Sequence, residues 1–331
     1  MRLFRFLLPL LLTAALLSSC DKSLVVNEEW QDITVVYGLL DTMDDTTYIK
    51  VTKAFLGEGN ALIYSAIPDS SNYPHILEVR IDEFSGEQLL RSIPCDTVTI
   101  RNKQAGDSVF YYPDQLMYFT TAKLNPALLY KLYIRNKITG KEVTAQTILL
   151  DDFTVDFPQV TVSYPADRSF RVKWQQTKNG KRYQLLIRFH YTETLKADPS
   201  VTQKKYFDWL LFNYIEPVDY NSTQPQPIDL YFPGEAFYTA VGANIPVNSA
   251  VSRTAKFCDY IFSVAAPDFD TYLDVTAPSL SLVQEKPAYT NIVNGIGLFS
   301  ARINKTVDSL FFSDLTLKEL KVNTHTKDLG F

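Results

Sequence analysis

The chain has 331 residues, with 32 Lys and Arg against 37 Asp and Glu, for a formal net charge of −5 at pH 7. Its basic residues are nowhere clustered as a nucleic-acid-binding face requires, so we expect no nucleic acid among its partners. Hydrophobic residues make up 46% of the chain, against only 12 Gly and 17 Pro. This composition excludes a disordered chain and allows two domains of ordinary size.

The first twenty residues have the pattern of a bacterial lipoprotein signal peptide. A basic start precedes an apolar run over 6–17, and Leu17-Ser18-Ser19-Cys20 matches the lipobox. The run is about 12 residues long, whereas a membrane-spanning helix needs roughly 20. We predict a signal peptide over 1–19, a lipid on Cys20 that anchors the chain to a membrane, and a lipidated tether over 20–31. A plain secretory signal cut at another site is the alternative.

Short runs of alternating or β-branched residues recur through the first half of the chain. The clearest predicted strands cover 33–40, 47–53, 75–84, 129–136 and 142–149, with shorter ones near 89–93, 97–101, 108–112 and 116–121. Short strands separated by turn signals indicate a β-sandwich. We therefore predict an N-terminal sandwich over 32–150, which ends at Asp151-Asp152.

The second half contains a characteristic pair of predicted strands. The run 169–174 ends in Trp174, and a polar turn leads to the Tyr-rich alternating run 183–191. This pair resembles the B and C strands of a fibronectin type III domain, and 259–266 resembles its F strand. The resemblance implies that Trp174 lies in the core. We predict a fibronectin-like sandwich over 151–331.

An insertion at about 195–257 is expected to interrupt this second sandwich. Its apolar segment 204–214 is compatible with either a strand or a helix, and 234–243 has the pattern of a short helix. A further helix is expected over 268–275. The predicted fold is therefore mostly β, with two tandem immunoglobulin- or fibronectin-like sandwiches, the second carrying a partly helical insertion.

Two glycines mark the C-terminal region. Asn294-Gly295 is a tight-turn signal, and Gly297 two residues later suggests a bulge or a close backbone approach. Final strands are expected over 298–303 and 307–317. With the lipobox, the first-half strands and the helix at 234–243, this motif resembles uncharacterised Bacteroidota lipoproteins that carry only a domain-of-unknown-function label.

That resemblance implies an outer-membrane lipoprotein, often encoded near TonB-dependent transporters. An outer-membrane transporter or another surface protein is thus the expected partner, and we favour the cell surface over the periplasmic face. The resemblance transfers no catalytic residue. In these bacteria, Asp followed by Ser or Thr and then an apolar residue or Thr is an O-glycosylation pattern, although such pairs are also ordinary turn residues. The candidate acceptors are Thr42, Thr46, Thr97, Ser108 and Ser309.

The sequence shows no pattern of catalytic or metal-binding chemistry. His75, His190 and His325 have no second His or Cys at ligand spacing, so we predict no metal site and no cofactor. There is no G-x-S-x-G and no phosphate-binding loop. Cys95 and Cys258 are expected to be free thiols, with a disulfide as the alternative. An envelope hydrolase whose site is assembled across the fold stays open as a third function.

Aromatic side chains are the remaining candidates for a binding surface. They gather in the expected insertion, at Tyr206, Trp209, Tyr214, Tyr220 and Tyr231. The alternative is that they pack the segment onto its own domain, above all around Trp209. We predict a non-catalytic, lipid-anchored binding or scaffolding protein, with a glycan-binding lipoprotein of a polysaccharide uptake system as the alternative.

Overall fold

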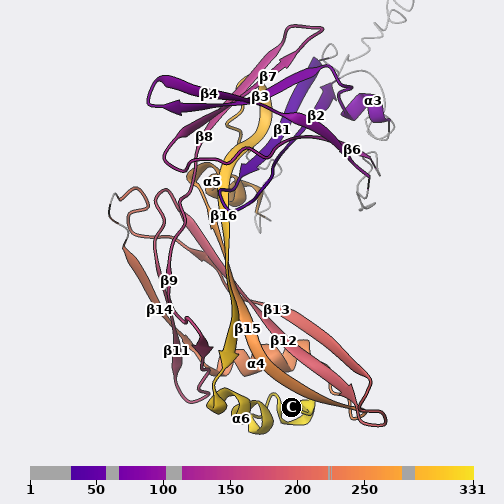
Figure 1. Ribbon diagram of the computed structural model, residues 1–331, viewed down its shortest axis with the longest axis vertical. Helices are drawn as coiled ribbons and strands as arrows, with labels where there is room; N and C mark the ends of the chain where they lie inside the picture. Colours follow the sequence, from indigo (N-terminus) through magenta and orange to yellow (C-terminus); the bar gives the residue numbers. More distant parts are fainter. Residues whose placement is uncertain (1–30, 57–66, 102–113, 223, 225, 278–287) are drawn as a thin grey trace, which may run out of the picture.

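The structure is a computed structural model that describes residues 31–56, 67–101, 114–222, 224, 226–277 and 288–331. Strands dominate these residues and form sheets of nine, three and four strands. The prediction of a mostly β chain is confirmed. The molecule is elongated, and its β-rich upper and lower halves follow each other along the long axis (Figure 1).

The upper half contains the strands of the first part of the chain (Figure 1). One layer has the order β1-β2-β6-β5, formed by Gln31–Leu40, Thr47–Leu56, Gln115–Thr120 and Asp96–Ile100. The other has the order β4-β3-β7-β8, formed by Gln88–Pro94, Leu77–Ser85, Leu129–Asn136 and Glu142–Ile148. A one-turn helix, α3 (Pro68–Ser71), lies before β3. The strand expected over 108–112 lies outside the described residues.

The lower half has a long four-strand array and a shorter sheet. The array has the order β13-β12-β15-β16, formed by Thr202–Ile215, Arg182–Leu195, Val251–Ala265 and Gly295–Phe312. The shorter sheet has the order β14-β11-β9, formed by Pro227–Pro233, Ser169–Gln175 and Val155–Phe157. The short strand β10 (Thr161–Val162) pairs with the end of β16. Helix α4 (Glu235–Asn244), helix α6 (Asp314–Val322) and the 3-10 turn η1 (Lys327–Leu329) complete it. Helix α5 (Pro267–Thr276) lies at the junction of the two halves (Figure 1), where its Tyr272 packs on Tyr37 of β1.

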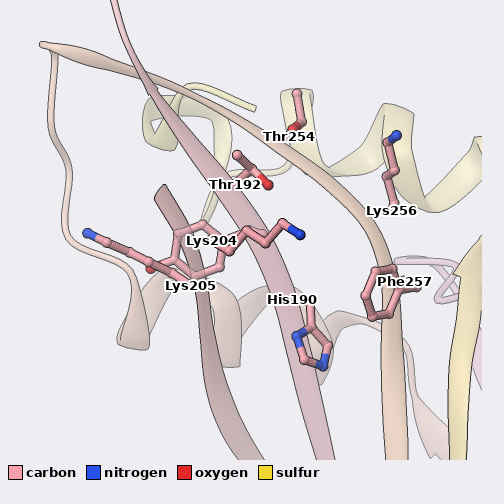
Figure 2. A pocket seen from close by; sticks show the side chains of 8 residues that line it. His190, Thr192, Lys204, Lys205, Thr254, Lys256 and Phe257 are labelled. Atoms are coloured by element: carbon pink, nitrogen blue, oxygen red, sulfur yellow. The ribbon is translucent and has the colours of Figure 1, made fainter. Parts of the chain in front are cut away.

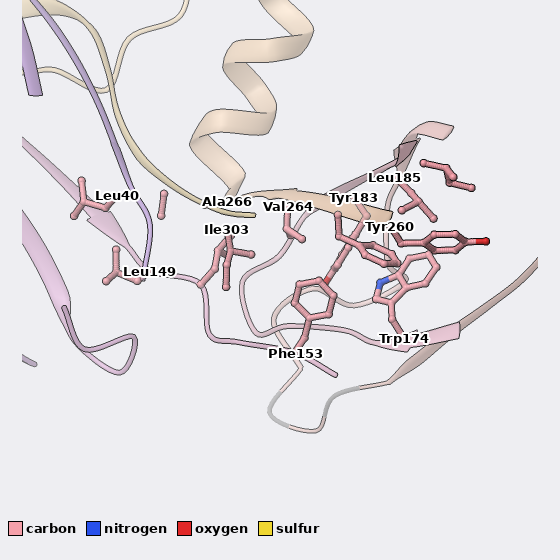
Figure 3. Packing of buried hydrophobic residues seen from close by; sticks show 14 of the residues in the cluster. Leu40, Leu149, Phe153, Trp174, Tyr183, Leu185, Tyr260, Val264, Ala266 and Ile303 are labelled. Carbon is pink, nitrogen blue, oxygen red and sulfur yellow. The ribbon is translucent and has the colours of Figure 1, made fainter. Parts of the chain in front are cut away.

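Trp174 lies in the lower core, as the resemblance to a fibronectin type III strand pair implied. Its side chain is fully buried and stacks on Phe212, with ring centroids 5.7 Å apart and planes at 14°. Tyr183 and Phe262 pack against the same indole at 5.7 and 5.3 Å. Buried side chains continue from this core through the junction as far as Leu40 in the upper half (Figure 3).

β16 belongs to both halves of the molecule. Its first part pairs in parallel with β1, from Gly295 opposite Thr34 to Ala301 opposite Leu40, and its second part pairs antiparallel with β15. The boundary predicted at 151 assigned residues 295–301 to the second half, whereas the structure pairs them with the first strand. Pairing between the two ends of a chain leaves no local sequence signal, which explains the difference.

The residues expected to form an insertion contribute strands to both lower sheets. β13 pairs with β12 over most of its length, and β14 pairs with β11 from Pro227 to Pro233. The prediction of an insertion over 195–257 is therefore corrected, since much of this segment forms strands of the two lower sheets. The ambiguous run 204–214 is a strand, and the helices expected near 234–243 and 268–275 are present as α4 and α5.

The last predicted strand is too long at its end. β16 stops at Phe312, and Ser313 caps α6 because its side chain accepts a hydrogen bond from the Thr316 amide at 3.2 Å. A serine that accepts from the third residue beyond it is a standard helix start. Among the described residues, the structure contains no helix with the length and hydrophobicity needed to span a membrane.

Candidate functional site

The outer face of β13, β12 and β15 carries the main candidate surface. Along β12, alternate residues from Tyr183 to Phe189 are buried, so the residues between them point away from the core. On β13 the same alternation turns Tyr206 and Leu210 outward, where they are 58% and 44% exposed. Large hydrophobic side chains left exposed together on a sheet face are candidates for contact with a partner.

Two exposed tyrosines on this face are each covered by an arginine from β12. The Arg188 guanidinium lies 4.5 Å from the Tyr206 ring centroid, and that of Arg182 lies 4.4 Å from the Tyr214 ring. Arg188 is also held by Asp208, to which it donates two hydrogen bonds of 2.7 and 2.9 Å. These bonds keep the pKa of Asp208 below its ordinary value. The Arg188 side chain is therefore held over Tyr206 by contacts within the protein.

The five aromatic residues predicted to form a binding surface do not lie together. Trp209 turns inward, and its ring packs 6.1 Å from that of the buried Phe237. Tyr220 is half-buried, and Tyr231 lies on β14 in the opposite sheet. Tyr206 and Tyr214 are the two that share a face. The period of two residues along a strand already separates Trp209 from Tyr206, once the segment is known to be a strand.

A cavity of about 290 Å³ lies against the same three strands (Figure 2). Its lining includes Lys204 and Lys205 from β13, Lys256 and Phe257 from β15, and His190 from β12. The β-ladders bring these residues together. Thr192 of β12 lies opposite Lys204 on one side and opposite Thr254 of β15 on the other. We call this cavity the basic hollow.

His190 is held in place from two sides of the hollow. Its Nε2 lies 2.7 Å from Oδ2 of Asp259, and its ring packs against Phe257 with centroids 4.7 Å apart. Oδ1 of Asp259 accepts a hydrogen bond of 2.9 Å from the Ser309 amide. Both carboxylate oxygens of Asp259 are thus engaged. His190, for which the sequence predicted no metal-binding role, lies in the lining of the hollow.

The lysines of the hollow differ in how their charge is balanced. Lys205 forms an ion pair with Glu193, which also accepts from the buried Arg253 at 2.8 Å. Burial acts to raise the pKa of Glu193, but the hydrogen bonds from Lys205 and Arg253 outweigh it and lower the pKa. Lys204 and Lys256 are exposed and form no ion pair with any residue that the structure describes.

The remaining candidates for reactive chemistry among the described residues are clusters of metal ligands and the two thiols. Residues 31–56, 67–101, 114–222, 224, 226–277 and 288–331 contain no group of three or more His, Cys, Asp or Glu side chains placed to hold a metal. Cys95 and Cys258 are free thiols, as predicted. Burial raises the pKa of each thiol to about 12. At neutral pH both are therefore protonated and poorly nucleophilic.

The predicted modification sites have different environments. Thr97 and Ser309 are exposed, whereas Thr42 and Thr46 are half-buried. The Thr42 hydroxyl donates a hydrogen bond of 3.2 Å to the carbonyl oxygen of Leu150. Ser108 and the predicted lipidation site Cys20 lie outside the described residues.

No family model matches the chain, and no curated protein matches its sequence. Function is therefore inferred from the residues and from the geometry of the outer face.

Proposed function

We propose that this protein is a non-catalytic, lipid-anchored binding protein of a bacterial outer membrane, accessory to a TonB-dependent transport system. A lipid on Cys20 would anchor it, with the cell surface favoured over the periplasmic face. The observation that carries the binding role is the pair of exposed tyrosines, Tyr206 and Tyr214, each stacked under an arginine on one sheet face.

The strand order supports two sandwich domains of the immunoglobulin and fibronectin class. In the lower half, β9-β11-β14 and β13-β12-β15-β16 have the order expected for the A-B-E and C′-C-F-G sheets of a fibronectin type III domain. The upper half would form a second sandwich, completed by residues 295–301 of β16. Such scaffolds commonly present a rigid sheet face to a partner.

The chemistry of this face supports a protein partner. Tyrosine and arginine are, with tryptophan, the residues enriched at the energetic centres of protein interfaces. Asp208 already holds Arg188 against Tyr206, so binding would cost little additional side-chain entropy. One side of each tyrosine ring faces a guanidinium, which leaves less aromatic surface for a sugar.

The distance between the Tyr206 and Tyr214 rings also favours a protein partner over a sugar chain. Eight residues of extended strand separate Tyr206 from Tyr214, which at about 3.3 Å per residue is at most about 26 Å. Neighbouring rings of a sugar chain lie much closer together than this. A second function, glycan binding, is supported by a different observation, the basic hollow with its threonines and Phe257.

The proposal is tested in two steps in the native host. Cys20→Ala should release the protein from the membrane fraction, and retention of this variant in the membrane would contradict a lipid anchor. The double variant Tyr206→Ala/Tyr214→Ala should then fail to co-purify with an outer-membrane transporter that the wild type retains. Tyr231→Ala, an exposed tyrosine on the opposite sheet, is the matched control and should co-purify normally. Equal retention by both sets of variants would contradict the binding face.

A further inference from the structure

We propose that the basic hollow binds an anionic sugar, a saccharide ring that carries a carboxylate, sulfate or phosphate group. Lys204 and Lys256 would bind the anionic group, while Thr192, Thr254 and Phe257 would contact the ring. This inference rests on the second proposed function, glycan binding, and specifies the class of glycan.

Charge is the first reason. The chain carries a net charge of −5, yet the residues that line the hollow include three lysines and a histidine and no carboxylate. Glu193 balances Lys205, which leaves the ammonium groups of Lys204 and Lys256 as a local excess of two positive charges. The nearby Asp259 is already engaged by His190 and the Ser309 amide. A concave site with one sign of charge attracts ligands of the other sign.

The positions of the lysines across the sheet are the second reason. Lys204 comes from the edge strand β13 and Lys256 from β15, on either side of β12. Two strand spacings of about 4.8 Å separate the two strands, and Lys256 lies two residues beyond Thr254, the β15 residue in register with Lys204 through Thr192. Figure 2 shows the Lys204 side chain lying across the face toward Thr192 and His190. Both long side chains can therefore converge on one anionic group placed between them.

Size and surface chemistry indicate a sugar ring in addition to an anion. A volume of about 290 Å³ is close to the lower end of small-molecule sites, roughly 300 Å³, and much larger than a single water's share of about 30 Å³. The hydroxyls of Thr192 and Thr254 can each donate to and accept from sugar hydroxyls. The half-exposed Phe257 ring, backed by His190, offers an apolar surface to the C–H face of a sugar.

The two lysines favour a ligand with an oxyanion group but do not distinguish a carboxylate from a sulfate or a phosphate. An ammonium group acts as a compact point charge with rotatable donors, whereas a guanidinium requires a planar, two-oxygen partner. A uronate, a sulfated sugar and a sugar phosphate therefore share the chemistry that this site recognises.

Calorimetric titration of the lipidated protein in detergent at low salt tests this inference. The probes are galacturonate, N-acetylglucosamine 6-sulfate and glucose 6-phosphate, with galactose as the neutral sugar and inorganic phosphate as the bare anion. We expect at least one anionic sugar to bind, galactose to bind at least tenfold more weakly, and affinity to fall as salt is added. Equal affinity for inorganic phosphate would overturn the role of the ring, and binding of none of the charged sugars would overturn the site.

Substitutions of the lining lysines test whether the anionic sugar binds in the basic hollow. Lys204→Gln/Lys256→Gln should lose roughly tenfold or more in affinity, as expected when charge-assisted hydrogen bonds are removed. Lys318→Gln, an exposed lysine on α6, should bind like the wild type. Equal affinities of the two variants would overturn the assignment. Thermal unfolding verifies that both variants are folded, and Thr192→Val offers a second, charge-neutral test.

The two proposals can fail separately. If the hollow variants retain the transporter and no anionic sugar binds, this inference fails and the protein-binding face stands. If anionic sugars bind through Lys204 and Lys256 while the Tyr206/Tyr214 variant still retains the transporter, the hollow stands and the protein-binding face fails.

Discussion

Gly297 lies so close to Val36 that a Cβ atom on Gly297 would be 2.0 Å from the Val36 carbonyl oxygen. The φ angle of Gly297 is +115°, in a region that other residues rarely adopt. The two residues are paired in the parallel β1–β16 ladder, which connects the upper and lower halves. Glycine is thus required at position 297, where β16 pairs with β1.

Replacing this glycine should destabilise the protein strongly. We expect Gly297→Ala to lower the free energy of unfolding by about 2–4 kcal/mol, because the methyl group collides with backbone that cannot move aside. Gly140→Ala is the control, since Gly140 also has a positive φ, +72°, but has no atom within 4 Å of the Cβ position. It should cost only about 1 kcal/mol. Equal losses in denaturant titrations would show that the close approach to Val36 is unimportant.

The buried indole of Trp174 should be a second point of sensitivity. Trp174→Ala removes a side chain that stacks on Phe212 and packs on Tyr183, so we expect a loss of about 3–5 kcal/mol. Tyr231→Ala, on the exposed face of β14, should cost about 1 kcal/mol or less. Chemical unfolding followed by far-UV circular dichroism measures both. A Trp174 variant as stable as the Tyr231 variant would contradict the core assignment.

Local features of the fold could be predicted from the sequence, whereas pairing between distant strands could not. Trp174 and the alternating strand after it reveal the core because burial imposes a period of two on neighbouring residues. The two partners of β16 lie far from it along the chain. The same limit applies to the basic hollow, where Lys204 and Lys256 meet through strand registers that include irregularities near residue 190. Serine is a favoured residue at helix starts, yet the strand expected over 307–317 continued through Ser313, which in the structure begins α6.

Acid should weaken the upper half through Glu83. This carboxylate accepts hydrogen bonds from Arg91 at 2.6 Å and from Tyr130 at 2.8 Å. The hydrogen bonds from Arg91 are the main cause of a pKa below the ordinary value of 4.5, against an opposing effect of burial. A lowered pKa in the folded state means that the stabilisation is complete above 4.5 and is lost as the pH falls through the folded value.

Glu83→Gln should therefore cost more at pH 7 than at pH 3. We expect a loss of roughly 1 kcal/mol at pH 7, since the partner Arg91 is half-exposed to solvent, and a smaller loss at pH 3. Free energies of unfolding at the two pH values give the comparison. A cost that is the same at both pH values would contradict an ionised, hydrogen-bonded Glu83.

The two free thiols should be inert in the folded protein. Burial raises the pKa of both Cys95 and Cys258 to about 12, so at pH 8 only about one thiol in 10⁴ is ionised. In a Cys20→Ala chain, an aromatic disulfide reagent should label neither thiol rapidly until denaturant is added, and then should label both. Fast labelling of either residue under native conditions would contradict its raised pKa.

The most direct test of the binding role compares two exposed tyrosines on opposite sheets of the lower half. A photo-activatable cross-linking residue placed at Tyr206 or at Tyr231 would be irradiated in intact native cells. Each tyrosine lies under an arginine, Arg188 or Arg171, so the two positions differ chiefly in the face that they occupy. We predict one dominant cross-link, to an outer-membrane transporter, from position 206 and none from 231. Cross-links from 231 alone, equally from both positions, or from neither would contradict the claim that the outer face of β13, β12 and β15 binds the partner.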